Sequence, residues 1–147
     1  MKSSSPTDTG YESRIRESFA RQQVMNLIGA SLTLVGPGAI DIELPYRADL
    51  SQQNGYVHAG MLTTIADSAC GYAAYTLMPA GSDVLSVEFK VNLLRPAVGE
   101  IFIAEARVIK AGRTLTVTRC DVFGMKGEEK KLIATMLATM ICRPWLG

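Results

Sequence analysis

Residues 54–67 read NGYVHAGMLTTIAD, and this stretch decides the fold. A polar loop ends at His58-Ala59-Gly60, where the sequence predicts the start of a helix that continues to about residue 77. The helix is apolar on most sides, which is typical of a helix buried at the centre of a domain. Asp67 is its single acidic residue, and a carboxylate in such surroundings is costly unless it is paired or functional.

The start of this helix and Asp67 together suggest a reaction at a carbonyl group. A helix start offers unpaired backbone N–H groups and a partial positive charge, which can polarise a carbonyl. Asp67 could attack that carbonyl or activate water, so the stretch predicts ester or thioester hydrolysis. The nine residues from His58 to Asp67 span roughly 13 Å along a helix axis. If both groups act on one carbonyl, the simplest arrangement is a dimer in which each subunit supplies one of them.

The composition is that of a single globular domain of 147 residues. Apolar residues make up 48% and charged residues 20%, with a net charge of +1, so no broad charge favours nucleic acid or an anionic membrane. No apolar run approaches the roughly 20 residues of a membrane span, and the N-terminus lacks the apolar segment of a secretory signal. Cys70, Cys120 and Cys142 are odd in number and widely spaced, which argues against a disulfide framework or a zinc site and indicates a cytoplasmic setting.

The N-terminal part is expected to contain a tail and one helix. Residues 1–10 are expected to form a flexible tail, and residues 11–147 a single domain. The pattern from Thr9 to Glu12 fits a capping box, which predicts a helix from Tyr11. Ile15 and Phe19 are four residues apart and would form its inner face.

Six strands are predicted from alternation and turn signals. Alternation is clearest in residues 84–94, where Ser86 belongs to the polar set, and connections of hairpin length at 111–113 and 124–128 separate the last three strands. The predicted strands are residues 30–35, 39–44, 84–94, 101–110, 114–123 and 131–142. Two precede the buried helix and four follow it, so we predict an α+β fold in which a curved antiparallel sheet wraps around one long central helix.

The last strand is apolar on both faces. Strict alternation places Ile133, Leu137 and Ile141 on one face. The other face would carry Leu132, Ala134, Met136 and Met140. A half-solvated sheet does not need two apolar faces, so we expect another subunit to cover one of them, with a dimer as the minimum assembly and a homotetramer as the expected one.

This layout resembles the hotdog-fold thioesterases, most closely the phenylacetate-pathway (PaaI-like) acyl-CoA thioesterases. The similarity covers roughly residues 27–142. It rests on Asp67, nine residues after the His of an H-[GA]-G motif, and on four further segments. These segments are residues 57–60 (VHAG), 85–89 (LSVEF), 94–97 (LRPA) and 110–115 (KAGRTL).

The resemblance implies hydrolysis of an acyl-CoA thioester without metal or cofactor. It implies that the N–H of Ala59, with Gly60 next to it, holds the thioester carbonyl, while His58 shapes the loop. Asp67 would be the nucleophile or general base. Many relatives have Gly directly after the His, and Ala59 supplies the same N–H but would be strained at a positive φ.

Further roles follow from the same resemblance. Ser86 would help to place the attacking water, and Gln52 falls at the loop position that contacts the thioester. Gln53 and Asn54 are close by, and the sequence leaves open which side chain reaches the substrate. The phosphates of CoA require basic residues. Arg95 and Arg113 are the candidates by family position, with Lys90 and Lys110 as second choices.

Other interpretations remain open at this stage. A hotdog protein could bind acyl-CoA without hydrolysing it, as a sensor or scaffold, and a hydratase or dehydratase can share the fold. Cys70 is interpreted as core packing, because no second His is present to activate it. The acyl group is expected to be hydrophobic from the apolar residues Met61, Leu62, Tyr72 and Met78, while its length and ring content are open.

Overall fold

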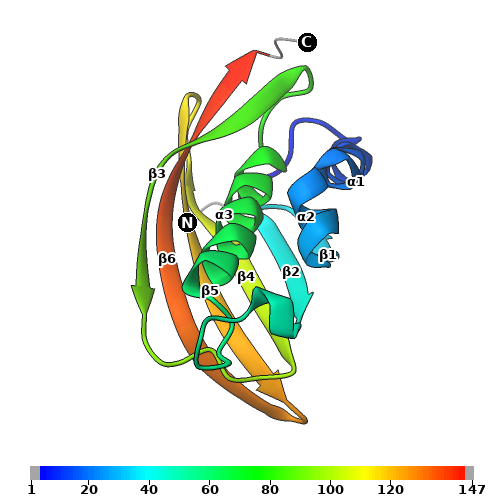
Figure 1. The fold of residues 1–147 in the computed structure, drawn as a ribbon. Helices are drawn as coiled ribbons and strands as arrows, with labels where there is room; N and C mark the ends of the chain where they lie inside the picture. Colours follow the sequence, from blue (N-terminus) through cyan, green and yellow to red (C-terminus); the bar gives the residue numbers. More distant parts are fainter. Residues whose placement is uncertain (1–3, 145–147) are drawn as a thin grey trace.

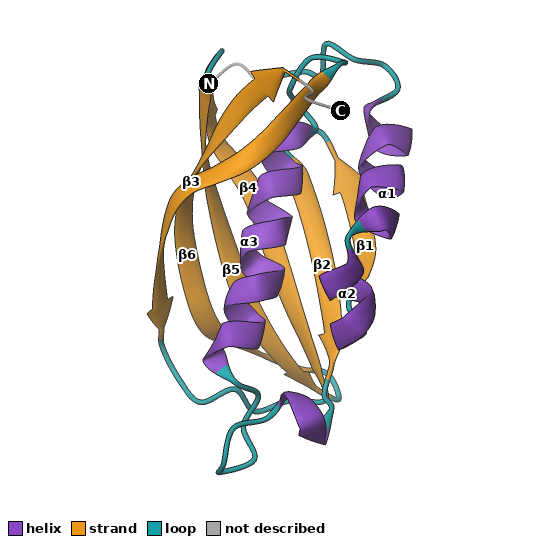
Figure 2. Ribbon diagram, turned by 45° about the horizontal axis from the view of Figure 1, so that its top comes forward, coloured by secondary structure: helices purple, strands orange, loops and turns teal. Residues whose placement is uncertain are grey.

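The computed structural model describes residues 4–144, in which a six-stranded antiparallel sheet curves around one long helix (Figures 1 and 2). The sheet order is β1-β2-β4-β5-β6-β3, so β1 and β3 are its edges. The helices are α1 (Tyr11–Arg21), α2 (Gln23–Ile28) and α3 (Ala59–Tyr75), with a short 3-10 turn at Ala48–Leu50. The strands are β1 (Ser31–Gly36), β2 (Ala39–Pro45), β3 (Ser82–Leu93), β4 (Ile101–Ala111), β5 (Leu115–Lys126) and β6 (Glu129–Pro144). The predicted fold class is confirmed.

Helix α3 is the centre of the core, as its apolar sequence predicts. Most of its residues are buried against the inner faces of the strands, while α1 and α2 lie along one side of it (Figure 2). Alanines at 66, 69, 73 and 74 are fully buried, and their small side chains let the strands approach the helix closely. None of the helices within residues 4–144 is long and apolar enough to cross a membrane.

Helix α1 begins at Tyr11 as predicted, but not by the predicted capping box. Gly10 is the N-cap residue, without a side-chain cap, and its N–H donates to the carboxylate of Asp8 at 2.9 Å. Ile15 and Phe19 form the buried face, as predicted. Of the predicted tail, residues 1–3 lie outside the described residues, and the flexibility of the remainder stays a prediction.

Arg14 ties α1 to the end of α3. Its guanidinium donates to the carbonyl oxygens of Tyr75 at 3.2 Å, Met78 at 3.0 Å and Pro79 at 3.3 Å. It also lies 4.2 Å above the centre of the Tyr75 ring and forms an ion pair with Asp8. A cation at the C-terminal end of a helix is stabilised by the carbonyl groups there, so this contact fixes α1 relative to the core.

The last strand contains a bulge that alternation does not reveal. Phe123 pairs with Leu132 and Val122 pairs with Ala134, which leaves Ile133 as an extra residue in β6. Ile133 is therefore buried inside, and the prediction that it shares a face with Leu137 and Ile141 is wrong. Leu137 is 50% exposed on the outer face, and its cover by another subunit stays a prediction.

Gly124 lies in the core and not in the predicted connection 124–128. Strand β5 continues to Lys126, so the hairpin turn is only Gly127 and Glu128. A Cβ atom on Gly124 would lie 2.5 Å from both Ile133 Cδ1 and the carbonyl oxygen of Val98. The bulged Ile133 thus occupies the space that a side chain at position 124 would need.

Gly124→Ala is expected to destabilise the protein by about 1–3 kcal/mol, because the added methyl group overpacks this contact. Gly71→Ala is the matched control, since a Cβ there meets nothing within 4 Å and alanine favours a helix interior. Urea unfolding of both variants measures the difference. Equal stability of Gly124→Ala and the wild type would contradict the tight packing of Ile133 on Gly124.

Candidate active site

Asp67 and Ser86 are brought together although 19 residues separate them. The hydroxyl of Ser86 on β3 donates to Oδ1 of Asp67 on α3 at 2.7 Å. Both residues line a cavity of about 300 Å³ between α3, β3 and the N-terminal helices. The carboxylate is therefore half-buried and accessible, and it is held in one orientation by a hydroxyl group.

A bulge at Val87 turns Ser86 toward Asp67. Ser86 pairs with Met140 and Glu88 pairs with Thr139, so Val87 is an extra residue in β3. Ser86, before the bulge, lies on the inner face of the sheet beside buried Met140. Phe89, after the bulge, lies on the same face beside buried Ala138. The alternation predicts Ser86 on the polar face, together with Glu88. The structure corrects this, because one extra residue reverses the faces.

His58 caps the start of α3 with its side chain. Its Nδ1 accepts a hydrogen bond from the N–H of Gly60 at 2.8 Å, so the ring proton is assigned to Nε2. A Cβ on Gly60 would lie 2.9 Å from the same Nδ1, which explains why glycine stands there. The carbonyl oxygen of His58 accepts from the N–H of Met61.

The N–H of Ala59 is the donor that remains at this helix start. Within residues 4–144 it has no hydrogen-bond partner, and Ala59 lines a second cavity of about 420 Å³. Positive φ angles occur only at glycines among these residues, so the expected strain at Ala59 does not arise. An unpartnered N–H at a helix start beside a cavity can donate a hydrogen bond to a carbonyl oxygen.

Gln52 lies in the same cavity, and its carbonyl oxygen is already used. Oε1 accepts from the N–H groups of Asn54 at 2.5 Å and Tyr56 at 3.3 Å, which holds the loop closed. The loop is tied further by a bridge between Ser51 and Val57. The Nε2 group of Gln52 makes no hydrogen bond with the described part of the chain, and it is available as a donor.

The two cavities have no lining residue in common. Asp67 and Ser86 are near the start of β3, whereas Ala59 and Gln52 are near its end at Leu93. One protomer therefore does not bring the N–H donor and the carboxylate to the same place, as the helix spacing predicts.

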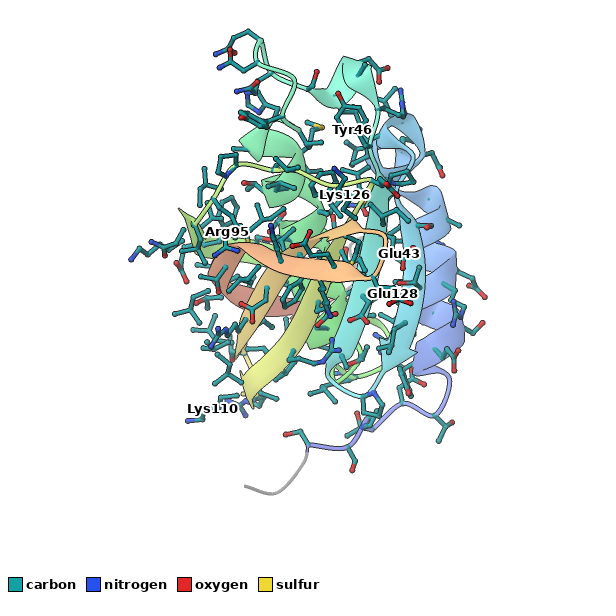
Figure 3. All side chains as sticks on the ribbon, turned by 90° about the horizontal axis from the view of Figure 1, so that it is seen from below. Glu43, Tyr46, Arg95, Lys110, Lys126 and Glu128 are labelled. Carbon is teal, nitrogen blue, oxygen red and sulfur yellow. The ribbon has the colours of Figure 1, made fainter. Side chains whose placement is uncertain are left out.

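The basic candidates are spread over the molecule. Arg95 lines the cavity of Ala59, whereas Arg113 lies in the turn between β4 and β5 at the opposite end of the sheet. Lys110 is near Arg113, far from Arg95 in Figure 3. Lys90 lies on the outer face of β3 opposite Leu137, so no common phosphate site forms within a protomer.

Asn54 and the apolar candidates also separate. Asn54 lines a third, smaller hollow, and its side chain is not at the Ala59 cavity. Leu62 lines the Ala59 cavity, and Tyr72 lines the Asp67 cavity. Met61 and Met78 line neither cavity and pack in or against the core, so the expectation that they shape the acyl site is not supported.

Sequence reasoning missed a polar wall of the Asp67 cavity. Ser18 lies on α1 and Gln22 between α1 and α2, while Ser68 lies on α3 and Asp83 on β3. Burial raises the pKa of the Tyr72 phenol, and the nearby Ser18 hydroxyl opposes this more weakly. No motif marks these residues, because they meet only through the packing of α1 on α3.

The cap predicts a stability effect at His58. His58→Ala is expected to lower the free energy of unfolding by about 0.5–2 kcal/mol, because the N–H of Gly60 loses its acceptor. His58→Asn keeps an N-capping side chain and is expected to restore most of this loss. Chemical denaturation of both variants measures the effect, and an alanine variant as stable as wild type would show that the cap contributes nothing.

Comparison with known proteins identifies the family of this chain. The sequence profile of the Thioesterase superfamily matches residues 54–131. A Halobacterium salinarum protein named as a candidate esterase is 30% identical over 104 residues, covering 67% of this chain and 68% of its own. Human acyl-coenzyme A thioesterase 13 is 27% identical over 93 residues, or 63% and 66% of the two chains.

Solved structures of thioesterases have the same fold as this chain. A thioesterase family protein from Silicibacter pomeroyi is 47% identical, with a TM-score of 0.91 over 92% of this chain and 100% of its own. The PaaI protein of the E. coli phenylacetic acid degradation operon has a TM-score of 0.81 at 17% identity, over 93% and 94% of the chains, and shares the fold. The chain therefore belongs to the thioesterase superfamily, with the hotdog fold, and is a thioester hydrolase.

Proposed function

We propose that this hydrolase cleaves acyl-CoA thioesters to the free acid and CoA. The observation that carries the proposal is the Asp67 carboxylate, oriented by Ser86 at 2.7 Å on the wall of an open cavity. A relative is named acyl-coenzyme A thioesterase 13, which supports CoA as the thiol.

Asp67 is the nucleophile or the general base of the reaction. As a nucleophile it forms a mixed anhydride and releases the CoA thiolate, and water then hydrolyses the anhydride. As a base it takes a proton from water that attacks the same carbonyl, after which the C–S bond breaks and CoA leaves as the thiolate. In both routes Ser86 holds the carboxylate, and its hydroxyl can also contact the attacking water.

The N–H of Ala59 stabilises the negative charge that develops on the carbonyl oxygen. It is a backbone donor at a helix start, which needs no reorganisation during the reaction. Nε2 of Gln52 supplies a second donor at the same cavity. His58 acts through the backbone, because its ring is engaged in the cap to Gly60.

A dimer joins the two half-sites. Strand β3 is an edge of the sheet and carries the apolar residues Leu85, Val87, Phe89 and Leu93, which are 43% to 54% exposed. A long apolar edge strand favours pairing with another strand. Antiparallel pairing of two β3 strands across a two-fold axis places the Ser86 end of one protomer next to the Leu93 end of its partner, so Asp67 meets Ala59 of the partner subunit.

The same pairing bears on the CoA phosphates. Arg95 lines the Ala59 cavity and is the residue best placed for them. Arg113 and Lys110 lie at the other end of the sheet. In the two-fold dimer, that end of one protomer lies next to the end of its partner that carries Arg95. Asn54, at the third hollow, and Lys90, on the outer face of β3, are secondary candidates.

Asp67→Asn is expected to lower thiol release by about 100- to 10,000-fold, because the attacking or proton-accepting group is lost. The assay measures free CoA from short, long and aromatic acyl-CoA substrates, with circular dichroism to confirm folding. Wild-type protein that binds acyl-CoA without releasing thiol would contradict hydrolysis and favour a binding role. Conversion of an enoyl thioester without thiol release would indicate a hydratase.

Ala59→Pro tests the N–H donor with little disturbance of the helix. Ala59 is the first residue of α3, where proline is tolerated, and His58 has φ −60° and ψ 135°, which suits a residue before proline. The variant is expected to lose about 100- to 1000-fold in kcat. Ala59→Gly keeps the N–H and is the control.

A mixed dimer tests whether the site is shared. One protomer carrying Asp67→Asn and one carrying Ala59→Pro, co-expressed with two affinity tags, would contain one intact site of two. About half of the wild-type activity is then expected per dimer, because two-fold symmetry places both defects in the same second site. A mixed dimer as inactive as its parents would contradict a site built from two protomers.

A further inference from the structure

Two hydrogen bonds join helix α3 to strand β3. One is the bond from the Ser86 hydroxyl to the Asp67 carboxylate at 2.7 Å. The other runs from the hydroxyl of Tyr75 to the carbonyl oxygen of Ser82 at 3.0 Å, and it is buried. Within residues 4–144 no further hydrogen bond links these two elements. The first bond belongs to the candidate active site, whereas Tyr75 does not line the cavity of Asp67.

The two bonds lie one after the other along the same pair of elements. Strand β3 runs back along α3 after the connection at residues 76–81 (Figure 1). Tyr75 and Ser82 flank this connection, and Asp67 and Ser86 lie eight residues back along the helix and four residues on along the strand. Eight helical residues rise about 12 Å and four strand residues about 13 Å. Ser86 therefore reaches the level of Asp67 when Ser82 is held at the level of Tyr75.

The start of β3 has few other anchors. The strand is an edge of the sheet and pairs within the protomer only with β6. Ser82 is opposite Pro144, which has no N–H to donate. The carbonyl oxygen of Ser82 accepts from the phenol of Tyr75 instead, and both residues are buried. A buried carbonyl that loses its donor is costly, so without this hydroxyl the strand start would move toward water.

Both partners of this contact are themselves fixed. The Tyr75 ring lies under the guanidinium of Arg14 at 4.2 Å, and Arg14 also donates to the carbonyl oxygen of Tyr75 at 3.2 Å. The N–H and the hydroxyl of Ser82 both donate to the carbonyl oxygen of Pro79, at 3.3 Å and 2.5 Å. These contacts do not involve the Tyr75 hydroxyl, so removing that hydroxyl alone isolates its effect on β3.

We propose that Tyr75 is a positioning residue for the hydrolysis, because its hydroxyl sets where β3 begins on α3 and so brings Ser86 to Asp67. The pairing of β3 with β6 is interrupted at Val87, directly after Ser86. The segment that carries Ser86 therefore depends on the anchor before it. Tyr75 lies outside the cavity lining, so it acts through the strand and not on the substrate. The inference rests on the proposed function and adds a residue to it.

The test begins with Tyr75→Phe, which removes the hydroxyl and keeps the ring under Arg14. Its kcat for acyl-CoA hydrolysis is expected to fall by about 10- to 100-fold, because a displacement of about 1 Å can cost that much. KM is expected to change little, since the cavity lining is unaltered. The double variant with Ser86→Ala is expected to be no slower than Ser86→Ala alone, because residues that act through one group are not additive.

Thr76→Val is the matched control. The buried hydroxyl of Thr76 accepts from the N–H of Gly38 at 2.8 Å and donates to the carbonyl oxygen of Ala73 at 2.7 Å. Its loss costs stability at the same end of α3 without a contact to β3. The melting temperature is expected to fall by about 2–4 °C in each variant, but kcat is expected to fall only in Tyr75→Phe.

Ser82→Ala provides a second variant if Tyr75→Phe does not fold. It removes the bond from the Ser82 hydroxyl to Pro79 and is expected to lower kcat less, again without effect in the Ser86→Ala background. Unchanged kcat in the folded Tyr75→Phe protein would overturn the inference. So would a loss that multiplies with that of Ser86→Ala, or an equal loss in Thr76→Val.

Amide hydrogen exchange separates this result from failure of the proposed function, because it needs no turnover. Residues 82–86 are expected to exchange faster in Tyr75→Phe than in the wild type and in Thr76→Val, since the start of β3 opens. Faster exchange there, with no thiol release by the wild type, would retain the anchor of Ser86 and reject hydrolysis. Thiol release by the wild type, with exchange and kcat unchanged in Tyr75→Phe, would retain hydrolysis and reject the role of Tyr75.

Discussion

The burial of α3 against the concave face of the sheet is the constraint on which the rest of the structure depends. Its small residues allow close packing of the strands, and a close-packed helix cannot shift without opening cavities. In our proposal the chemistry therefore lies at the two parts of α3 that reach the surface. One is the capped start with the Ala59 N–H, and the other is the side that carries Asp67.

Strand β3 supplies Ser86, the residue that orients Asp67. Its bulge turns Ser86 inward, and Phe89 and Val91 face the same side after the bulge. One strand therefore contributes a polar group and apolar residues on the same side. The strand is also the uncovered edge of the sheet. Ser86, which orients Asp67, therefore lies on the strand that pairs with the partner subunit in our proposal.

The N-terminal helices differ in role from the rest of the fold. Arg14 fixes α1 on the end of α3, and Phe19 packs on Tyr72 with ring centres 5.9 Å apart. These contacts hold Ser18 and Gln22 in the wall of the Asp67 cavity.

The sequence by itself determined the buried helix, the succession of strands along the chain and the candidate pair of Ala59 and Asp67. These features follow from local periodicity and helix geometry, which residues close in the chain specify. Only the tertiary structure decided the faces of Ser86 and Ile133, because each depends on one extra residue in a pairing with a distant strand. It alone separated Arg95 from Arg113 and brought Gln22 to Ser68, 46 residues away. Long-range register and packing carry no local signal, and these decisions set the chemistry of the site.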